Sequence, residues 1–344
     1  MSFEHTALVT DAIRRVVAGQ HLGEDEAAAV AGCIVRGEAT AAQIGALLVA
    51  LRIKGETVDE ISGFVRAVRG AATPVVIRSD DALDTCGTGG DGLGTFNIST
   101  VAAFVAAGAG CHIAKHGNRA SSSKCGSADV LEALGVNVQM TPERSARCID
   151  EIGVGFLFAP QYHPGARHAV GPRREIGVRT IFNTLGPLVN PANTKRQLMG
   201  IYDPRLTEVA ARVLQRNGST HVMVVCAEDG LDEISIESPT RVSELRDGAT
   251  RSFLLTPEEC GVNRGAVREL AGGDAAYNAG VCRDVLGGAR GAARDVVVLN
   301  AGAAICVAGR AATVRDGVRM AEESIDSRRA MAALERLIEA GKES

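Results

Sequence analysis

The 344-residue sequence contains no tryptophan, and aromatic residues of all kinds make up only 3% of it. Proteins that bind single-stranded nucleic acid stack its bases on aromatic side chains, so this composition disfavours that class. The formal net charge of −4 gives no overall attraction to nucleic acid or to an anionic membrane. We therefore expect no nucleic-acid partner and no membrane partner, and any anion-binding site has to be local.

The sequence also lacks paired cysteines, a signal sequence and a long apolar run. Its nine cysteines are scattered and form no CxxC pair, which predicts neither a disulfide framework nor a zinc site. The longest mostly apolar run, residues 101–114, is too short to span a bilayer, and no apolar signal core follows Met1. We expect a soluble cytoplasmic protein with reduced thiols.

What the sequence does contain predicts two domains. Its length and its 46% apolar content allow a large core. Two capping boxes, at residues 40–43 and 57–60, each precede apolar residues at helical spacing. We predict a small all-helical domain over residues 1–72, joined by a helical segment at about 164–190, and a large α/β domain over residues 73–344.

Beyond residue 72, short strand signals alternate with helix signals. The predicted strands cover residues 82–85, 112–115, 136–140, 220–226 and 233–236, and the predicted helices cover residues 99–107, 127–134, 204–217, 296–307 and 331–340. Such alternation is typical of the α/β class with a mainly parallel central sheet. Ligands of these sheets bind at the carboxyl ends of the strands.

Two polar, glycine-dense stretches follow two of the predicted strands. The first reads GTGGDGLGTFNIST over residues 87–100, and the second reads KHGNRASSSKCGS over residues 115–127. No acidic residue occurs between residues 92 and 128, and the second stretch carries three cations. Backbone N–H groups, hydroxyls and cations near helix N-termini hold phosphates. The two stretches therefore predict a site for a ligand with more than one phosphate.

Two common nucleotide motifs fail on the first stretch. Gly87, Gly89 and Gly92 match the dinucleotide fingerprint, but the acid-free span leaves no carboxylate for the ribose hydroxyls. The spacing of Gly89 and Gly94 matches a P-loop, but Thr95 stands where that motif needs lysine. The stretch is therefore interpreted as a glycine loop that leads into a helix N-terminus.

Two further groups of residues suggest a metal and a substrate carboxylate. Asp232 and Glu233 follow a turn, where adjacent carboxylates can share one hard cation such as Mg²⁺ with phosphate oxygens. A solvated turn remains the alternative. The segment 163–196 is rich in arginine, and an arginine there could hold a substrate carboxylate with two hydrogen bonds. Asp91 is the exception in the first stretch, because a carboxylate repels phosphate unless a cation bridges the two.

These motifs resemble those of the anthranilate phosphoribosyltransferase family over nearly the whole chain. The resemblance rests on GTGGD at 87–91, TFNIST at 95–100, KHGNR at 115–119, RRE at 173–175, RTIFN at 179–183 and GLDEIS at 230–235. It implies a nucleoside phosphorylase/phosphoribosyltransferase-like fold and a homodimer. It also implies transfer of phosphoribosyl from phosphoribosyl pyrophosphate to the amine of anthranilate, in tryptophan biosynthesis.

The resemblance also implies a role for each matching residue. Phosphoribosyl pyrophosphate would contact Gly87, Gly90, Asp91, Thr95, Asn97, Ile98, Ser99, Thr100, Lys115, His116, Gly117, Asn118, Arg119, Ala120, Ser121, Ser122, Ser123 and Ser127. Anthranilate would contact Gly87, Asn118 and Arg173, and Mg²⁺ would be held by Ser99, Asp232 and Glu233. Asp91 and Lys115 are the candidate catalytic residues, with Lys115 stabilising the departing pyrophosphate.

Two other functions remain open at this point. A pyrimidine-nucleoside phosphorylase shares the fold, but its loop is of the Lys-His-Ser-Thr type and binds one phosphate. The GTGGD loop and the acid pair Asp232–Glu233 of this sequence favour pyrophosphate with a metal. A nucleic-acid-binding relative without activity would be expected to lose the acid pair and to gain a basic groove. The net charge and the intact motifs favour the transferase.

Overall fold

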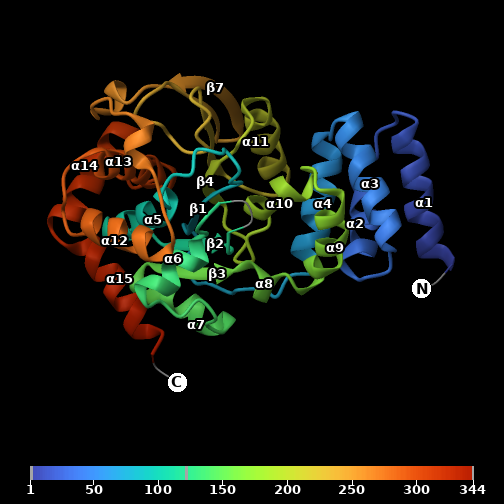
Figure 1. Ribbon diagram of the computed structural model, residues 1–344, viewed down its shortest axis with the longest axis horizontal. Coiled ribbons are helices and arrows are strands. Elements are labelled where there is room, and N and C mark those ends of the chain that lie inside the picture. Colours follow the sequence, from blue (N-terminus) through green and yellow to red (C-terminus); the bar gives the residue numbers. More distant parts are fainter. Residues whose placement is uncertain (1–2, 121–122, 343–344) are drawn as a thin grey trace.

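The computed structural model describes residues 3–120 and 123–342. A seven-stranded sheet stands at its centre, with a group of helices at each end (Figure 1). The strands are β1 (Leu83–Gly87), β2 (Ile113–Gly117), β3 (Val154–Phe158), β4 (Arg196–Gly200), β5 (His221–Ala227), β6 (Thr240–Arg246) and β7 (Ala249–Leu255). Their spatial order is β3-β2-β1-β4-β5-β6-β7. The first five strands pair in parallel, and β6 and β7 continue the sheet antiparallel.

The N-terminal region is all-helical, as predicted. Its helices are α1 (Phe3–Val17), α2 (Glu24–Val35), α3 (Ala41–Lys54) and α4 (Val58–Gly70). Both predicted capping boxes are present, because Thr40 caps α3 with Gln43 and Thr57 caps α4 with Glu60. The later helices α9 (Arg167–Ile176) and α10 (Phe182–Leu188) pack against this group, as Figure 1 shows.

The other helices cover the sheet or its ends. They are α5 (Ile98–Gly108), α6 (Ser127–Leu134), α7 (Pro142–Arg147), α8 (Ala159–Tyr162), α11 (Thr207–Arg216), α12 (Ala275–Leu286), α13 (Ala292–Val307), α14 (Val314–Asp326) and α15 (Arg329–Ala340). No helix among the described residues has the length and apolar character needed to cross a bilayer. Helices α5 and α13 pack against β1 and β4, whereas α11 packs against β5 and β6.

Successive side chains along the strands point alternately into two separate hydrophobic cores. Leu198 and Met223 enter the core of α5 and α12–α15. Met199 and Val222, one position away on the same strands, enter the core shared by α11 and the N-terminal helices. Successive strand residues point to opposite faces of a sheet, so one sheet separates the two cores. The helical region and the α/β region therefore pack against opposite faces of the same sheet.

Two of the predicted strands are wrong. Residues 136–140 alternate between buried and exposed positions, as a strand would, but no neighbouring strand pairs with them. Residues 233–236 form no strand because the side chain of Asn300 takes up the backbone of Ile234, accepting from its N–H and donating to its carbonyl (both 2.9 Å). Helix α6 has the predicted bounds, Ser127–Leu134, and its N-cap is Gly126.

Candidate active site

Two loops meet at the carboxyl edge of the sheet. The first loop (residues 88–97) runs from the end of β1 to the N-terminus of α5, and the second loop (residues 118–126) runs from the end of β2 to α6. Because β1 and β2 are parallel neighbours, both loops leave the sheet at the same edge. The structure thus brings together the two stretches that the sequence predicted to share a ligand.

The backbone of the first loop requires glycine. Gly89, Gly90, Gly92 and Gly94 have φ angles of 65°, 81°, 80° and 64°, a region that residues with a Cβ rarely adopt. The loop then delivers the chain to Asn97, the N-cap of α5. The N–H of Ser99 in that first turn donates to the side chain of Glu233, and the positive end of the helix dipole is suited to an anion.

The acid pair lies directly beneath the first loop. Asp232 is buried, and its Oδ2 accepts a hydrogen bond from the N–H of Gly89 (2.7 Å). The Oε1 of Glu233 accepts from the N–H of Ser99 (3.2 Å). A Cβ at position 200 would lie 1.6 Å from the carbonyl oxygen of Asp232. Gly200 on β4 therefore leaves the space in which the acid pair reaches the loop.

Both carboxyl groups of the pair are held in an environment that disfavours negative charge. Burial, reinforced by the neighbouring Asp91 carboxylate, raises the pKa of Asp232 to about 7. Burial and the charge of Asp232 raise the pKa of Glu233 to about 8. Asp232 thus lies beside two carboxyl groups, those of Asp91 and Glu233, and Lys115 is the cation that favours the ionised form of Glu233. The arrangement suits a hard divalent cation, which removes the repulsion between buried carboxylates.

Lys115 is buried behind the first loop. Its Nζ donates hydrogen bonds to the carbonyl oxygen of Thr85 and to the Oγ of Ser99 (3.3 Å). Burial lowers the pKa of Lys115, and the charges of Asp84 and Glu233 oppose that shift. This side chain therefore joins the end of β2 to the first turn of α5, where a phosphate would sit.

Asp84 is a site-forming residue that the sequence analysis missed. It is fully buried on β1, where its carboxylate accepts hydrogen bonds from the N–H of His116 (3.1 Å) and from the Nδ2 of Asn190 (2.8 Å). Asp84 therefore fixes the end of β2, at the start of the second loop. The available signal was a lone acid in an apolar strand.

The second loop is closed by one acidic residue of the following helix. Asp129 of α6 accepts hydrogen bonds from the N–H groups of Ala120 (2.9 Å) and Gly126 (2.8 Å). Ser127 donates from its Oγ to the carbonyl oxygen of Asn118 (3.2 Å). Both described ends of the loop, residues 118–120 and 123–126, are thereby held at the N-terminus of α6.

Arg119 is oriented toward protein carboxylates. Its guanidinium pairs with Glu132 (2.6 Å) and Asp129 (3.0 Å), and it lies over the ring of Phe158. Ser121 and Ser122, which the resemblance places at the ligand, lie outside the described residues. Ser123 donates from its Oγ to the carbonyl oxygen of Cys125 (3.4 Å).

The segment that joins the two regions, which includes α9 and α10, contains Arg173 and contacts the end of β2. Arg173 of α9 is partly buried over the ring of Phe182 (5.5 Å), and burial lowers its pKa without an opposing acid among the described residues. The Nδ1 of His116 lies 3.0 Å from the carbonyl oxygen of Gly186, which can only accept, so this nitrogen carries the proton and donates. Burial, together with His163, lowers the pKa of His116 to about 3, so the ring is neutral.

Arg179 contacts the first loop, although the sequence analysis gave it no role. It donates a hydrogen bond to the carbonyl oxygen of Gly90, and its guanidinium stacks on the ring of Tyr202 (4.2 Å). A Cβ at position 90 would lie 2.5 Å from this guanidinium. Gly90 therefore serves two needs, since it adopts a positive φ and leaves room for Arg179.

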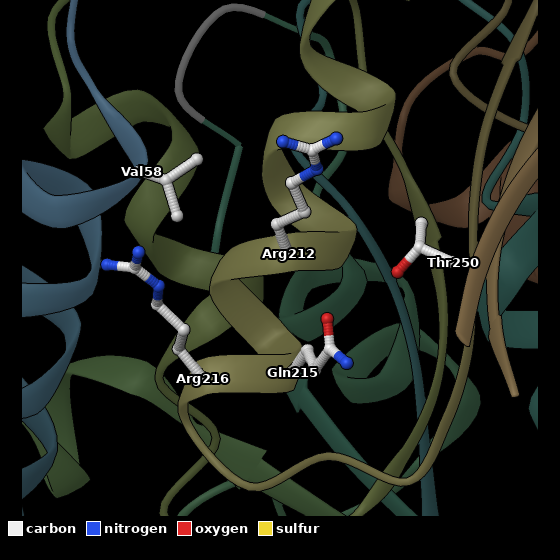
Figure 2. Close-up of a pocket in the computed structure, with 5 residues that line it drawn as sticks. All are labelled: Val58, Arg212, Gln215, Arg216 and Thr250. Atoms are coloured by element: carbon white, nitrogen blue, oxygen red, sulfur yellow. The ribbon is translucent and has the colours of Figure 1, made fainter. Parts of the chain in front are cut away.

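A separate pocket lies away from this edge, between α4, α11 and β7. Figure 2 shows its five lining residues, and its volume is about 380 Å³. Its two arginines are already paired, Arg212 with Glu208 and Arg216 with Asp59. The pocket contains no glycine loop and no acid pair, so we place the candidate active site at the carboxyl edge of the sheet.

Comparison with known proteins agrees with this architecture. Residues 10–72 match the model of the glycosyl transferase family helical bundle domain, and residues 79–331 match that of the glycosyl transferase family a/b domain. The anthranilate phosphoribosyltransferase of Moorella thermoacetica is 55% identical, with 95% of this chain and 96% of the relative covered. The enzyme of the same name from Thioalkalivibrio sulfidiphilus is 54% identical over 95% of this chain and 97% of its own length.

The chain belongs to the anthranilate phosphoribosyltransferase family.

Solved structures give the same assignment. The family member from Thermus thermophilus superposes with a TM-score of 0.92 at 42% identity, covering 97% of this chain and 100% of that one. The family member from Saccharomyces cerevisiae, solved with phosphoribosyl pyrophosphate and Mg, superposes with a TM-score of 0.87 at 27% identity, covering 97% and 98%. The predicted family, fold class and enzyme class are confirmed, and the comparisons support neither alternative function.

Proposed function

We propose that this enzyme transfers the 5-phosphoribosyl group of phosphoribosyl pyrophosphate to the amine of anthranilate. The anthranilate nitrogen forms a bond to the anomeric carbon, the bond from that carbon to the pyrophosphate oxygen breaks, and the amine loses a proton. The observation that carries the proposal is the convergence of a glycine loop, a helix N-terminus, a buried lysine and an acid pair at one edge of the sheet.

The pyrophosphate end of the donor is proposed to lie at the N-terminus of α5. There the ammonium of Lys115 lies 3.3 Å from the hydroxyl of Ser99, at the positive end of the α5 dipole. Charge that develops on a leaving pyrophosphate is stabilised by such preorganised donors. The anthranilate amine is already neutral near pH 7, so the site needs no strong general base.

Mg²⁺ is the metal that these residues fit. Among the described residues no group of three or more His, Cys, Asp or Glu is arranged to hold a metal alone. Asp232 and Glu233, with the hydroxyl of Ser99, supply a partial set of oxygen ligands, and Mg²⁺ commonly completes its shell with phosphate oxygens and water. When bound, the metal would neutralise charge on the leaving group. Asp91, beside Asp232, would face this metal or the donor.

The acceptor is proposed to bind on the opposite side of the ribose. Arg173 is half-buried without a carboxylate partner in the described chain, which suits the carboxylate of anthranilate, since guanidinium and carboxylate form two parallel hydrogen bonds. Asn118 and Gly87, at the ends of the two loops, would contact the same substrate. The neutral ring of His116 adds polar contacts there without adding charge.

Further proposals concern assembly and organisation. Val17, Ile53 and Val170 are 72%, 80% and 48% exposed on α1, α3 and α9, helices that pack side by side. These apolar side chains support a homodimer formed through the helical region. The division into residues 1–72 and 73–344, with the segment 164–190 packed on the smaller part, is supported by the contacts of α9 and α10. Nine buried free cysteines support a reducing, cytoplasmic location.

Anthranilate fluorescence tests the proposed reaction. We expect it to fall when phosphoribosyl pyrophosphate and Mg²⁺ are both added to the enzyme, because N-substitution changes the fluorophore. Either compound alone should leave the fluorescence unchanged. In the complete reaction, one pyrophosphate should appear for each anthranilate consumed. Phosphorolysis of a pyrimidine nucleoside without loss of anthranilate would contradict the proposal.

A further inference from the structure

A segment distant in sequence lies against the first loop along its backbone. The N–H of Phe96 donates to the carbonyl oxygen of Leu270 (3.0 Å), and the N–H of Gly272 donates to that of Gly94 (2.8 Å). Thr95 and Ala271 form the antiparallel bridge between these two bonds. Residues 270–272, here named the bracket segment, thus pair with the first loop as a short strand would.

The two backbones approach so closely that one position needs glycine. A Cβ at position 272 would lie 2.6 Å from the carbonyl oxygen of Thr95 and 2.7 Å from the nitrogen of Phe96. Contacts this short to backbone atoms cannot be relieved by moving a side chain. The bracket segment therefore sets the path of the first loop just before α5 begins.

Asn278 extends this contact through a chain of three hydrogen bonds. The N–H of Gly273 donates to its Oδ1 (2.8 Å), its Nδ2 donates to the Oδ1 of Asn97 (3.0 Å), and the Nδ2 of Asn97 donates to the carbonyl oxygen of Cys125 (3.1 Å). The donor-to-acceptor order of these three hydrogen bonds is fixed, because the first donor is a backbone N–H and the last acceptor is a backbone carbonyl oxygen. Each amide must therefore face one way only.

The chain of hydrogen bonds joins three parts of the molecule that meet at the donor site. Asn97 is the N-cap of α5, Cys125 belongs to the second loop, and Asn278 lies in α12 and is 2% exposed. A primary amide has two N–H groups and two lone pairs on oxygen. Asn97 therefore keeps one N–H for a ligand while its other contacts hold it still.

We propose that Asn278 is a positioning residue for the donor substrate. It orients Asn97 and also hydrogen-bonds the side chain of Cys125 in the second loop, and so holds the first and second loops at the separation that phosphoribosyl pyrophosphate requires. The proposal rests on the donor site proposed above. Asn278 itself touches no substrate and acts mainly through Asn97, because its side chain is buried behind that residue.

Binding of phosphoribosyl pyrophosphate in the presence of Mg²⁺, measured by calorimetry, tests this role. Asn278→Ala should weaken binding about tenfold, since it leaves the buried Oδ1 of Asn97 without its donor, and should leave the KM for anthranilate within twofold. Asn278→Asp keeps the size of the side chain and the acceptor for Gly273 but presents an oxygen to Asn97. It should bind the donor at least as weakly as the alanine variant.

A double-mutant cycle separates positioning from general destabilisation. If Asn278 acts through Asn97, the double variant Asn97→Ala, Asn278→Ala should bind no more weakly than Asn97→Ala alone. Ser324→Ala is the matched control, because the Ser324 hydroxyl is buried and donates to the carbonyl oxygen of Val105 at the other end of α5 (2.8 Å). The control should lower the melting temperature and leave donor affinity unchanged.

Amide hydrogen exchange of the unliganded protein supplies a readout that needs no substrate. In Asn278→Ala, exchange should become faster in the first loop and at residues 123–127, but not in Ser324→Ala. Unchanged exchange, additive effects in the cycle, or equal weakening in the control would overturn the role of Asn278. A wild-type enzyme that binds no phosphoribosyl pyrophosphate would instead overturn the donor site, and the exchange data would still decide whether Asn278 positions the loops.

Discussion

The first and second loops leave neighbouring strands at the same edge of the sheet, yet they are held in different ways. The first loop is shaped by distant parts of the chain, since Asp232 binds the N–H of Gly89 and the bracket segment pairs with residues 94–96. The second loop is closed largely by its own neighbour, Asp129, in the first turn of the next helix. The comparison shows that the proposed phosphate site combines a loop held by tertiary contacts with a loop held by local ones.

This difference predicts where substitutions will have long-range effects. A change far from the first loop in sequence should disturb it, because its geometry depends on β4, on the acid pair and on α12. The second loop should respond mainly to changes within residues 115–132. The following substitutions test that contrast, from the largest expected effect to the smallest.

Gly200→Ala should have the largest effect. The added Cβ would lie 1.6 Å from the carbonyl oxygen of Asp232, so the acid pair has to move away from the first loop. A misplacement of about 1 Å can cost about 100-fold in rate, and we expect kcat/KM to fall by about that factor. Gly70→Ala at the end of α4, where a Cβ meets nothing within 4 Å, is the control and should keep wild-type activity. Activity of Gly200→Ala within threefold of wild type would show that the first loop does not depend on β4.

Asp129→Asn should have an intermediate effect that stays within the second loop. It replaces a charged acceptor of two backbone N–H groups and of Arg119 by a neutral one, and hydrogen bonds to charged groups exceed neutral ones by about 1 kcal/mol. We expect the KM for phosphoribosyl pyrophosphate to rise about tenfold. Glu132→Gln, which weakens only the pairing of Arg119, is the matched control. Equal effects in both variants would mean that the hydrogen bonds from the N–H groups of Ala120 and Gly126 to Asp129 are unimportant for binding.

Arg119→Ala should have the smallest effect. Its side chain is 45% exposed and already paired with Glu132 and Asp129, and surface ion pairs contribute about 0–1 kcal/mol. Steady-state kinetics should show a change in the KM for phosphoribosyl pyrophosphate of less than about threefold. A rise of about tenfold or more would show that the guanidinium leaves these acids for a phosphate, as the family resemblance implies.

The parts of the molecule that sequence predicted correctly carry local signals. The capping boxes located α3 and α4, and the glycine-dense stretches located both loops. The positions of β1 and β2 were predicted to within two residues at each end, because polar loops interrupt short apolar runs. The chemistry of the acid pair could be proposed from two adjacent carboxylates after a turn, before its distance from the first loop was known.

The parts that sequence missed depend on contacts between distant residues. Residues 136–140 have the alternation of a strand, but a strand also needs a partner, and β2 pairs with β3 instead. Asp84 and Asn278 are single polar residues in buried elements, so nothing beside them in the chain reveals that they hold loops. The short strands β3 and β4 likewise became visible only in the sheet.

The central claim is that a distant acid pair completes the first loop as a metal-dependent donor site. Calorimetric titration of phosphoribosyl pyrophosphate into wild type and Asp232→Asn, each with Mg²⁺ and with EDTA, tests it most directly. We predict that EDTA weakens binding to wild type strongly and that Asp232→Asn, which keeps the shape of the side chain but loses its charge, binds about 100-fold more weakly with little response to Mg²⁺. Wild-type affinity and an unchanged response to Mg²⁺ in Asp232→Asn would contradict the account.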